Sequence, residues 1–339
     1  MSTGVFAGGA HARTVSRRCH AGAVTGRDDR DDLPLPRSLI EGIDDEADES
    51  DAFAIEAGRA AISRREWIAT LPDVVHAAAS RWGLRVGEPY QPGGVCAWVA
   101  PARAGDGSLV ALKVAWQHDE ARDEAEALRV WDGDGAVRLL AAEPAHGCDV
   151  LLLEACVPGT ALDEVEAPEA QDEIVAGLLR RLWGAAEADS FPWRPLAGMC
   201  AWWADEYESR FERADPARRL DAGLSRAGIE LFRELPCDPR DTALLCTDLH
   251  AANVLAAERE PWLAIDPKPY VGDPAYDVLQ HMLNHRERLL ADPVAFAARM
   301  AGLCDLDAHR VKLWLFARCV QESLSWLPEA AEIVPRLAP

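Results

Sequence analysis

The sequence CTDLHAANVL at residues 246–255 and the sequence WLAIDPKPYVGDPAYD at residues 262–277 decide the fold of this chain. Two short apolar runs, at 243–246 and 262–265, each end in a loop that carries an aspartate. Asp248 and Asn253 are five residues apart, and Asp266 follows Asn253 by thirteen. Each residue taken alone has an ordinary structural explanation: Asp248 as a turn former, Asn253 as a helix cap and Asp266 as a cap at a strand end. Together, at the ends of two short strands, they favour a functional site.

This set of side chains suits the transfer of a phosphoryl group. Such a transfer needs one carboxylate that orients the attacking hydroxyl and accepts its proton. It also needs an amide oxygen and a second carboxylate, which hold the Mg²⁺ ions that bridge the phosphates. The spacing D-x-x-x-x-N of Asp248 and Asn253 is that of a kinase catalytic loop.

A lysine in a predicted strand is a candidate ligand for the phosphates of the nucleotide. In SLVALKVAW, residues 108–116, strict alternation places Lys113 between two alanines on one face of the strand. Small neighbours leave room for a flat ligand, and the ammonium group can reach phosphates. A buried lysine needs a carboxylate partner, and the next helix offers Glu120, Glu124 and Glu126. Glu124 falls where the helix glutamate of a kinase faces this strand; the alternative is a surface lysine beside hydrated glutamates.

The turn QPGGVCAWV, residues 91–99, is a candidate cover for the phosphates because it carries Gly93 and Gly94. Two adjacent glycines are weak evidence alone, since most such pairs form plain hairpin turns. Other nucleotide fingerprints are missing, because the chain has no G-x-x-x-x-G-K-[ST] and no G-x-G-x-x-G after a strand. His281 and His285 have the i, i+4 spacing of a shared metal site. Because the sequence offers no third ligand, we expect His281 and His285 to be ordinary, partly exposed histidines that bind no metal.

Composition narrows the class of partner. The 339 residues include 35 basic and 57 acidic ones, a formal net charge of −22. Nucleic acids and anionic membranes reward clustered positive charge, so we expect neither as a partner. The charge suits a cationic small molecule, and it equally suits an acidic protein that its charge keeps soluble. Nine cysteines without a C-x-x-C pair, and no apolar run of about 18 residues, predict a reduced cytoplasmic protein without a membrane span.

The chain divides into segments of different character. Residues 1–52 lead from a Gly/Ala/Arg-rich stretch into the acidic EGIDDEADESD, and we expect this extension to be disordered. An amphipathic helix follows at 53–83, then strands near 95–99, 109–116, 136–140 and 150–153, with a helix at 119–131. After Pro158 the pattern is mostly helical, with candidates at 168–187, 199–212, 217–235, 274–290 and 308–322. The fold class predicted is α+β, with a small β-rich lobe and a larger helical lobe.

These stretches resemble the aminoglycoside phosphotransferase family, and most closely its streptomycin 6-phosphotransferase/hydroxyurea phosphotransferase branch. The resemblance spans about residues 55–335. It is carried by RWGLRVGEPYQPGGVCAWVAPAR (81–103), LVALKVAW (109–116), EAEALRVWDGDGAVRLL (124–140), LLLEACVPGTAL (151–162), TDLHAANVL (247–255) and WLAIDPKPYVGDPAYDV (262–278). The last stretch is the most specific to this branch.

The resemblance implies a bilobal, protein-kinase-like fold with ATP bound in its cleft. It implies an N-lobe at 53–153 for the nucleotide, a hinge at 154–158, and a helical C-lobe at 159–339 with the catalytic loop and the acceptor site. In the hinge, the backbone of Glu154, Cys156 and Val157 would meet the adenine.

The resemblance also implies a role for each site residue. Asp248 matches the catalytic base, and Asn253 and Asp266 match the Mg²⁺ ligands. Lys113 would hold the α- and β-phosphates, with Glu124 as its partner and the turn at Gly93 and Gly94 as their cover.

One departure concerns the usual His-Gly-Asp of the family, which is Cys246-Thr247-Asp248 here. The missing histidine normally supports the loop, so we expect altered support rather than lost activity. Thr247 has a Cβ where glycine is common, which restricts its backbone.

Residues after Asp266 are expected to support the site. Lys268 either meets the transferred phosphoryl group or pairs with Asp273, and structural pairing is favoured. Asp273 and Asp277 are expected to tie the following helix to the catalytic loop.

The acceptor site is expected in the helical lobe. Acceptors of the streptomycin type carry guanidinium groups, for which Asp205, Glu206, Glu208 and Glu322 are candidate carboxylates. Any one of them is equally at home on the solvated face of a helix in an acidic protein.

The sequence therefore predicts a cytoplasmic, ATP- and Mg²⁺-dependent O-phosphotransferase for a small molecule, most closely an aminoglycoside of the streptomycin type, that confers resistance. One alternative keeps the fold and changes the acceptor to hydroxyurea, a metabolic alcohol, an amino sugar or a protein hydroxyl. The other is a nucleotide-binding pseudokinase scaffold, for which Cys246-Thr247 is the one favourable feature. No oligomeric state follows from the sequence.

Overall fold

The computed structural model describes residues 33–41, 62–185 and 191–339, and these form two compact units. The sheet unit comprises the described residues up to 165 together with 252–268, and the helical unit comprises those within 166–251 and 269–339. The segment 252–268 thus belongs with the sheet, although it comes late in the sequence.

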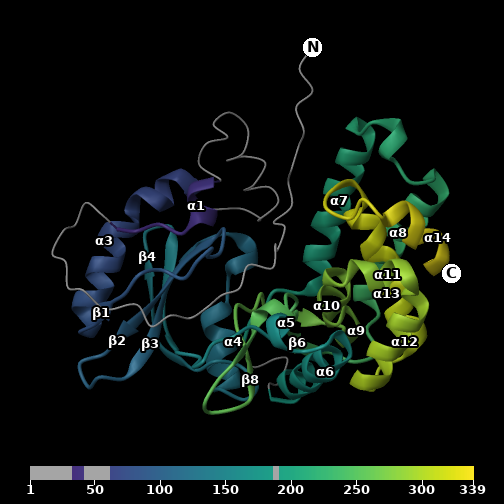
Figure 1. Ribbon diagram of the computed structural model, residues 1–339. Coiled ribbons are helices and arrows are strands. Elements are labelled where there is room, and N and C mark those ends of the chain that lie inside the picture. The colour runs from purple at the N-terminus through teal and green to yellow at the C-terminus, as the bar shows by residue number, and fades with distance from the viewer. Residues whose placement is uncertain (1–32, 42–61, 186–190) are drawn as a thin grey trace. The chain divides into compact units, whose positions relative to one another are not determined.

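A five-stranded antiparallel sheet forms the centre of the sheet unit (Figure 1), in the order β1-β2-β3-β5-β4. Its strands are β1 (Arg85–Val86), β2 (Ala97–Arg103), β3 (Leu109–Trp116), β4 (Leu139–Ala145) and β5 (Cys148–Glu154). The fourth strand begins later than the apolar pattern predicts, because Ala136 and Val137 pair instead with Ala264 of another strand.

The core of this unit lies between the sheet and helix α3 (Arg64–Trp82). Ser63 and Glu66 begin the helix with a reciprocal capping box, and Gly83 ends it at φ 63°. Its buried face comprises Trp67, Leu71, Val75 and Ala78, a spacing of one helical turn that repeats the sequence pattern.

Helix α1 (Arg37–Glu41) lies in the segment that the sequence predicts to be disordered, so that prediction is wrong for residues 33–41. The physical reason is that Leu39 is fully buried and that Leu33 and Leu35 pack against the same core. The rest of the predicted extension lies outside the described residues.

The second helical stretch of this unit is shorter than predicted. A 3₁₀ turn, η1 (Asp119–Ala121), precedes α4 (Glu124–Trp131), because Asp123 at φ 68° interrupts the helix. A hairpin of β7 (Val254–Ala256) and β8 (Trp262–Ala264) and the short helix α5 (Leu162–Val165) complete the unit.

The helical unit contains long helices and one small sheet. Its long helices are α6 (Pro168–Ala185), α7 (Leu196–Arg213), α8 (Ala222–Glu234), α12 (Pro293–Cys304), α13 (Ala308–Gln321) and α14 (Ala330–Leu337). The predicted helix 274–290 is three short ones, α9 (Pro274–Asp277), α10 (Leu279–Asn284) and α11 (Arg286–Ala291). Strands β6 (Ala243–Leu245) and β9 (Tyr270–Gly272) pair antiparallel.

Helix α13 is the core helix of this unit, because it is buried along most of its length and contacts α8, α9, α12 and α14. The contact with α8 is close. A Cβ added to Gly228 would lie 2.5 Å from a methyl group of Val320.

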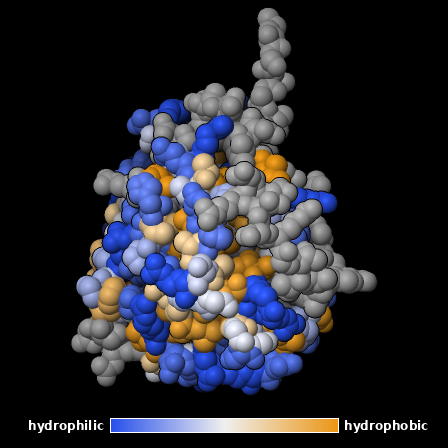
Figure 2. Space-filling view, turned by 90° about the vertical axis from the view of Figure 1, so that its left-hand side faces the viewer, coloured by the Kyte–Doolittle hydropathy of each residue, from blue (hydrophilic) through white to orange (hydrophobic). Residues whose placement is uncertain are grey.

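Hydrophilic and hydrophobic residues share the surface of the protein (Figure 2). Figure 2 shows one face, on which hydrophobic residues occur in small groups among hydrophilic ones. Within the described ranges, no helix is both long and apolar enough to cross a bilayer.

Candidate active site

Lys113 on β3 is the centre of a buried charge cluster. Its side chain is 7% exposed, and its Nζ lies 2.7 and 2.8 Å from the two carboxylate oxygens of Glu124. A third oxygen, Oδ1 of Asp266, lies 2.5 Å away. Of the three candidate glutamates, Glu124 is the one that pairs with Lys113, as the sequence predicts. Glu124 is the first residue of α4.

The charges in this cluster act on one another. Burial alone would lower the pKa of Lys113, but the carboxylates of Asp266 and Glu124 outweigh it and hold that pKa above its ordinary value. Burial raises the pKa of Glu124 to about 7, and the positive charge of Lys113 opposes that rise. The lysine is therefore charged at neutral pH, and its charge is shared between two acids.

Asn253 and Asp266 stand at the same end of the β7–β8 hairpin. Asn253 precedes β7 and Asp266 follows β8, and the carbonyl oxygen of Asn253 accepts a hydrogen bond of 2.9 Å from the Ile265 N–H. The side chain of Asp266 remains 49% exposed. Carboxylate and amide oxygens are ligands that Mg²⁺ prefers, so the chemistry of these two residues, at one end of the hairpin, fits that ion.

Asp248 belongs to the helical unit, in the loop that follows β6. The buried Asp277 fixes this loop, because its carboxylate accepts hydrogen bonds from the Cys246 N–H (2.9 Å) and the Thr247 N–H (2.6 Å). Trp183 donates a third bond to Asp277, at 2.8 Å. Burial raises the pKa of Asp277 to about 6. The predicted tie between the following helix and the catalytic loop is thus made by Asp277.

Thr247 has a left-handed backbone, at φ 52°. This conformation is strained for a β-branched residue and explains why glycine is common there. The bond from its N–H to Asp277 stabilises the conformation.

Asp273 does not contact the catalytic loop in the way predicted. Its carboxylate caps α9 at the Ala275 N–H, accepts from Trp314 Nε1 at 2.7 Å, and pairs with Arg310. These bonds tie α9 to α13. Lys268 lies 3.7 Å from Glu120, within the sheet unit.

The predicted hinge begins at Glu154, and both carboxylate oxygens of this residue accept hydrogen bonds. Arg259 Nε lies 2.9 Å from Oε1, and the Arg138 N–H donates to Oε2 at 3.0 Å. Cys156 and Val157 follow as partly buried residues. Sequence reasoning missed Arg259, which also donates to the carbonyl oxygens of Gly133 and Ala136, because nothing local in the sequence marks a contact over more than a hundred residues.

The turn at 91–94 has Gly93 at φ 83°, a conformation that favours glycine. Gly94 has no such requirement. The segment around Ser38 holds this turn by hydrogen bonds, another contact that the sequence did not predict.

The candidate acceptor carboxylates all have arginine partners. On α7, Asp205 and Glu208 both pair with Arg233, and Glu206 pairs with Arg210. Glu322 is 5% exposed, pairs with Arg318, and accepts from the Ser325 hydroxyl at 2.5 Å.

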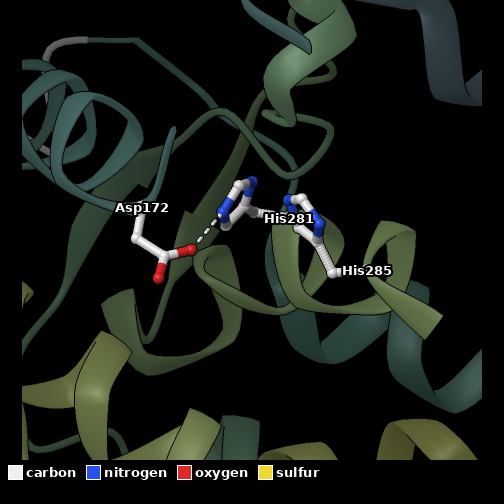
Figure 3. A group of neighbouring side chains, drawn as sticks. All are labelled: Asp172, His281 and His285. Carbon is white, nitrogen blue, oxygen red and sulfur yellow. Dashed lines mark hydrogen bonds and ion pairs between the residues drawn. The ribbon is translucent and has the colours of Figure 1, made fainter. Parts of the chain in front are cut away.

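A histidine pair forms a separate cluster in the helical unit (Figure 3), where His281 and His285 lie beside Asp172 of α6. The prediction of partly exposed histidines is wrong for His281, which is fully buried and lies 2.9 Å from Asp172. Asp172 thus supplies the third candidate ligand that the sequence lacked. Its two oxygens, however, also accept three bonds of 2.7 Å from Arg288 and Arg299. Two guanidinium groups oppose a metal ion at this carboxylate, so the cluster is an ion-pair network that joins α6, α10, α11 and α12.

Comparison with known proteins places this geometry in a family. The profile of the family described as "Aminoglycoside/hydroxyurea antibiotic resistance kinase" matches residues 82–330. A hydroxyurea phosphotransferase from Kitasatospora aureofaciens is 37% identical over 79% of this chain and 76% of its own. A streptomycin 6-kinase from Streptomyces griseus is 35% identical over 77% of this chain and 84% of its own.

Solved structures share the fold. An aminoglycoside phosphotransferase from Streptomyces rimosus, in complex with ADP and streptomycin, superposes with a TM-score of 0.50 at 19% identity, over 76% of this chain and 99% of its own. A choline/ethanolamine kinase family protein from Mesorhizobium loti has a TM-score of 0.50 at 18% identity, over 72% of this chain and 80% of its own. The predicted α+β, kinase-like fold is thus confirmed, and on the sequence matches this chain belongs to the aminoglycoside/hydroxyurea antibiotic resistance kinase family.

Proposed function

We propose that this protein transfers the γ-phosphoryl group of ATP to a hydroxyl of a streptomycin-type aminoglycoside and thereby confers resistance in the cytoplasm. The observation that carries the donor half is the cluster in which one buried lysine, Lys113, joins Glu124 and Asp266. The family and its streptomycin 6-kinase members support the acceptor.

On the donor side, Lys113 provides a fixed positive charge for the α- and β-phosphates. Its bond to Glu124 holds the ammonium group at one point of β3, and the raised pKa of Lys113 keeps it charged at neutral pH. Asn253 and Asp266 would hold Mg²⁺, which supplies neutralisation of phosphate charge when bound. The rate enhancement then comes from positioning and from preorganised charge rather than from a covalent intermediate.

On the acceptor side, Asp248 is the general base. The acceptor oxygen bonds to the γ-phosphorus, the bond from that phosphorus to the β,γ-bridging oxygen breaks, and Asp248 takes the hydroxyl proton. Asp277 positions Asp248 indirectly, because it fixes the two peptide N–H groups just before it.

Charge favours a cationic acceptor. The net charge of −22 attracts cations over a distance set by ionic strength. Asp205, Glu206 and Glu322 are the proposed acceptor carboxylates, and they would exchange their arginine partners for the guanidinium groups of the ligand.

Hydroxyurea is a second candidate acceptor, favoured by the 37% identical hydroxyurea phosphotransferase. The two acceptors differ in size and charge, so one assay separates them. Purified protein is incubated with ATP and Mg²⁺ and with streptomycin, hydroxyurea or neither, followed by mass analysis of the acceptor.

The proposal predicts ADP formation with streptomycin and a mass gain of one phosphate on the antibiotic. A mass gain on hydroxyurea alone would reassign the acceptor. ADP formation at background with both acceptors, with ATP still bound, would overturn the acceptor and leave the donor half standing.

A further inference from the structure

The segment Leu33–Ile40, called the strap below, lies against the sheet unit. Leu39 is fully buried with Trp67 and Trp98 in the core between α3 and the sheet. The indole Nε1 of Trp98 donates to the carbonyl oxygen of Pro34 at 2.9 Å. The strap is therefore anchored at both its beginning and its end.

Between these anchors, the strap bonds to the turn at 91–94. The Ser38 N–H donates to the Pro92 carbonyl oxygen at 3.1 Å. The Ser38 hydroxyl lies 2.8 Å from that same oxygen and 2.8 Å from the carbonyl oxygen of Gly94. The Arg37 N–H donates to Gln91 Oε1 at 3.1 Å. Bonds thus reach the turn on both sides of Gly93.

Gly93 itself is in close contact with the strap. A Cβ at this position would lie 2.4 Å from Cβ of Pro36. Because real Cβ atoms never approach so closely, the strap and the turn fit only with glycine at 93.

Arg64, at the start of α3, joins the two segments from a third side. Its Nε donates to the Val95 carbonyl oxygen at 3.0 Å, and its Nη2 donates to the Ser38 carbonyl oxygen at 3.3 Å. Carbonyl oxygens of residues 92, 94 and 95 are therefore all tied toward the strap and α3.

The turn leads directly into the strand beside Lys113. The Trp116 N–H donates to the Cys96 carbonyl oxygen at 2.8 Å, and Val99 of β2 pairs with Lys113 of β3. The charges of Lys268 and Asp266 also act on the thiol of Cys96, which is partly buried. The end of the turn is thus close to the residues assigned to the nucleotide phosphates.

We propose that the strap is a positioning element for nucleotide binding, in which Ser38 holds the turn 91–94 in the conformation that covers the ATP phosphates. This rests on the proposed function. Carbonyl oxygens carry partial negative charge, and those of Pro92 and Gly94 would repel a phosphate if the turn rotated. The Ser38 hydroxyl keeps them directed at the strap, and Ser38 itself touches no substrate.

The test is Ser38→Ala in the full chain, because it removes the hydroxyl and leaves Leu39 and the core intact. Ser108→Ala is the matched control, since the Ser108 hydroxyl bonds to Asp106 in the distant β2–β3 hairpin, at 2.7 Å. For both variants and wild type, Mg²⁺-ATP binding is measured by calorimetry, together with the KM for ATP, the KM for the acceptor, kcat and the thermal midpoint.

Loss of one hydrogen bond predicts that Ser38→Ala binds Mg²⁺-ATP about threefold to tenfold more weakly, with a matching rise in the KM for ATP. The KM for the acceptor and kcat are expected to stay near wild type, the thermal midpoint is expected to fall by no more than a few degrees, and Ser108→Ala is expected to resemble wild type in ATP binding. A merely structural role would lower the thermal midpoint and affect both substrates alike.

Three results would overturn the proposal. If wild type binds ATP and Ser38→Ala binds it equally well, the strap does not position the turn, and the proposed function stands. If Ser38→Ala loses stability and both KM values rise together, the role is structural. If wild type itself binds no ATP, the proposed function fails and the strap proposal fails with it.

Discussion

At the scale of single residues, Lys113 is a buried charge with two acidic partners, Glu124 and Asp266. Its side chain and that of Glu124 are 7% and 6% exposed, whereas Asp266 is half exposed. A buried ion pair is weak evidence of net stabilisation, but removing one partner leaves the other charge without compensation. The two acids therefore respond differently when the lysine is lost.

Lys113→Met is expected to lower the free energy of unfolding by about 3–5 kcal/mol, because Glu124 stays buried without a partner. The double variant Lys113→Met/Glu124→Leu is expected to recover most of that stability. It is not expected to recover ATP binding. Denaturant unfolding and calorimetry measure the two effects. Arg129→Met is the control, since its pair with Glu126 is solvent-exposed and contributes about 0–1 kcal/mol. Equal losses in Lys113→Met and the double variant would contradict the buried-pair account.

His285 predicts a pH dependence of stability. Burial, helped by the nearby positive charge of Arg288, lowers the pKa of His285 to about 4. An unfolded histidine has a pKa of about 6.5, so between about pH 6.5 and pH 4 the unfolded chain binds more protons than the folded chain. Stability is therefore lost as the pH falls from about 6.5 to about 4.

His285→Phe keeps a ring against Phe296 and removes the titrating group. We expect its free energy of unfolding to fall less than that of wild type between pH 6.5 and pH 4, whereas the exposed control His309→Phe follows wild type. Urea unfolding at several pH values measures the difference. Parallel curves for wild type and His285→Phe would show that another group is responsible.

The site residues divide into those that a motif reveals and those that only the fold reveals. Lys113, Asp248, Asn253 and Asp266 stand at fixed spacings from strand ends, and the structure brings Lys113 and Asp266 together across 153 residues. The residues that contact these segments from elsewhere in the chain belong to no sequence motif. Ser38, Arg259 and Trp183 act through contacts between segments far apart in the sequence, and their own neighbours in the sequence give no hint of the partner.

At the scale of elements, periodicity located the helices and strands, and turn chemistry decided where they end. The apolar pattern over 274–290 continues through three helices, but Asp273 caps one start and His285, at φ −104° and ψ 60°, ends another helix. Likewise Asp123 in a left-handed conformation divides the stretch 119–131. Hydrophobic periodicity reports which face is buried, and it is insensitive to such single-residue breaks.

Two helical glycines test the packing of the helical unit. Gly228→Ala in α8 forces a methyl group to within 2.5 Å of Val320, so we expect a loss of about 1–3 kcal/mol in the free energy of unfolding. Gly177→Ala in α6 is the matched control, because nothing lies within 4 Å of the added Cβ. Here the better helix propensity of alanine is expected to add about 0.5–1 kcal/mol. Thermal or denaturant unfolding gives both values, and a stabilising Gly228→Ala would contradict the close α8–α13 contact.

At the scale of the whole molecule, the residues proposed for the chemistry are divided between the two units. The four residues proposed for the nucleotide all lie in the sheet unit, although Asn253 and Asp266 come more than a hundred residues after Lys113 and Glu124. Asp248, the proposed base, belongs to the helical unit. Nucleotide binding and proton transfer should therefore be separable by substitution.

The central claim is that Asp248 takes the acceptor proton while Asp266 serves the nucleotide. The most direct test measures acceptor-dependent ADP formation and Mg²⁺-ATP binding in Asp248→Asn beside Asp266→Asn. We predict that Asp248→Asn binds Mg²⁺-ATP like wild type and turns over about 10²–10⁴ times more slowly, as expected for loss of a general base. Asp266→Asn is predicted to lose the Mg²⁺-dependent part of nucleotide binding. Turnover at the wild-type rate in Asp248→Asn would contradict the account.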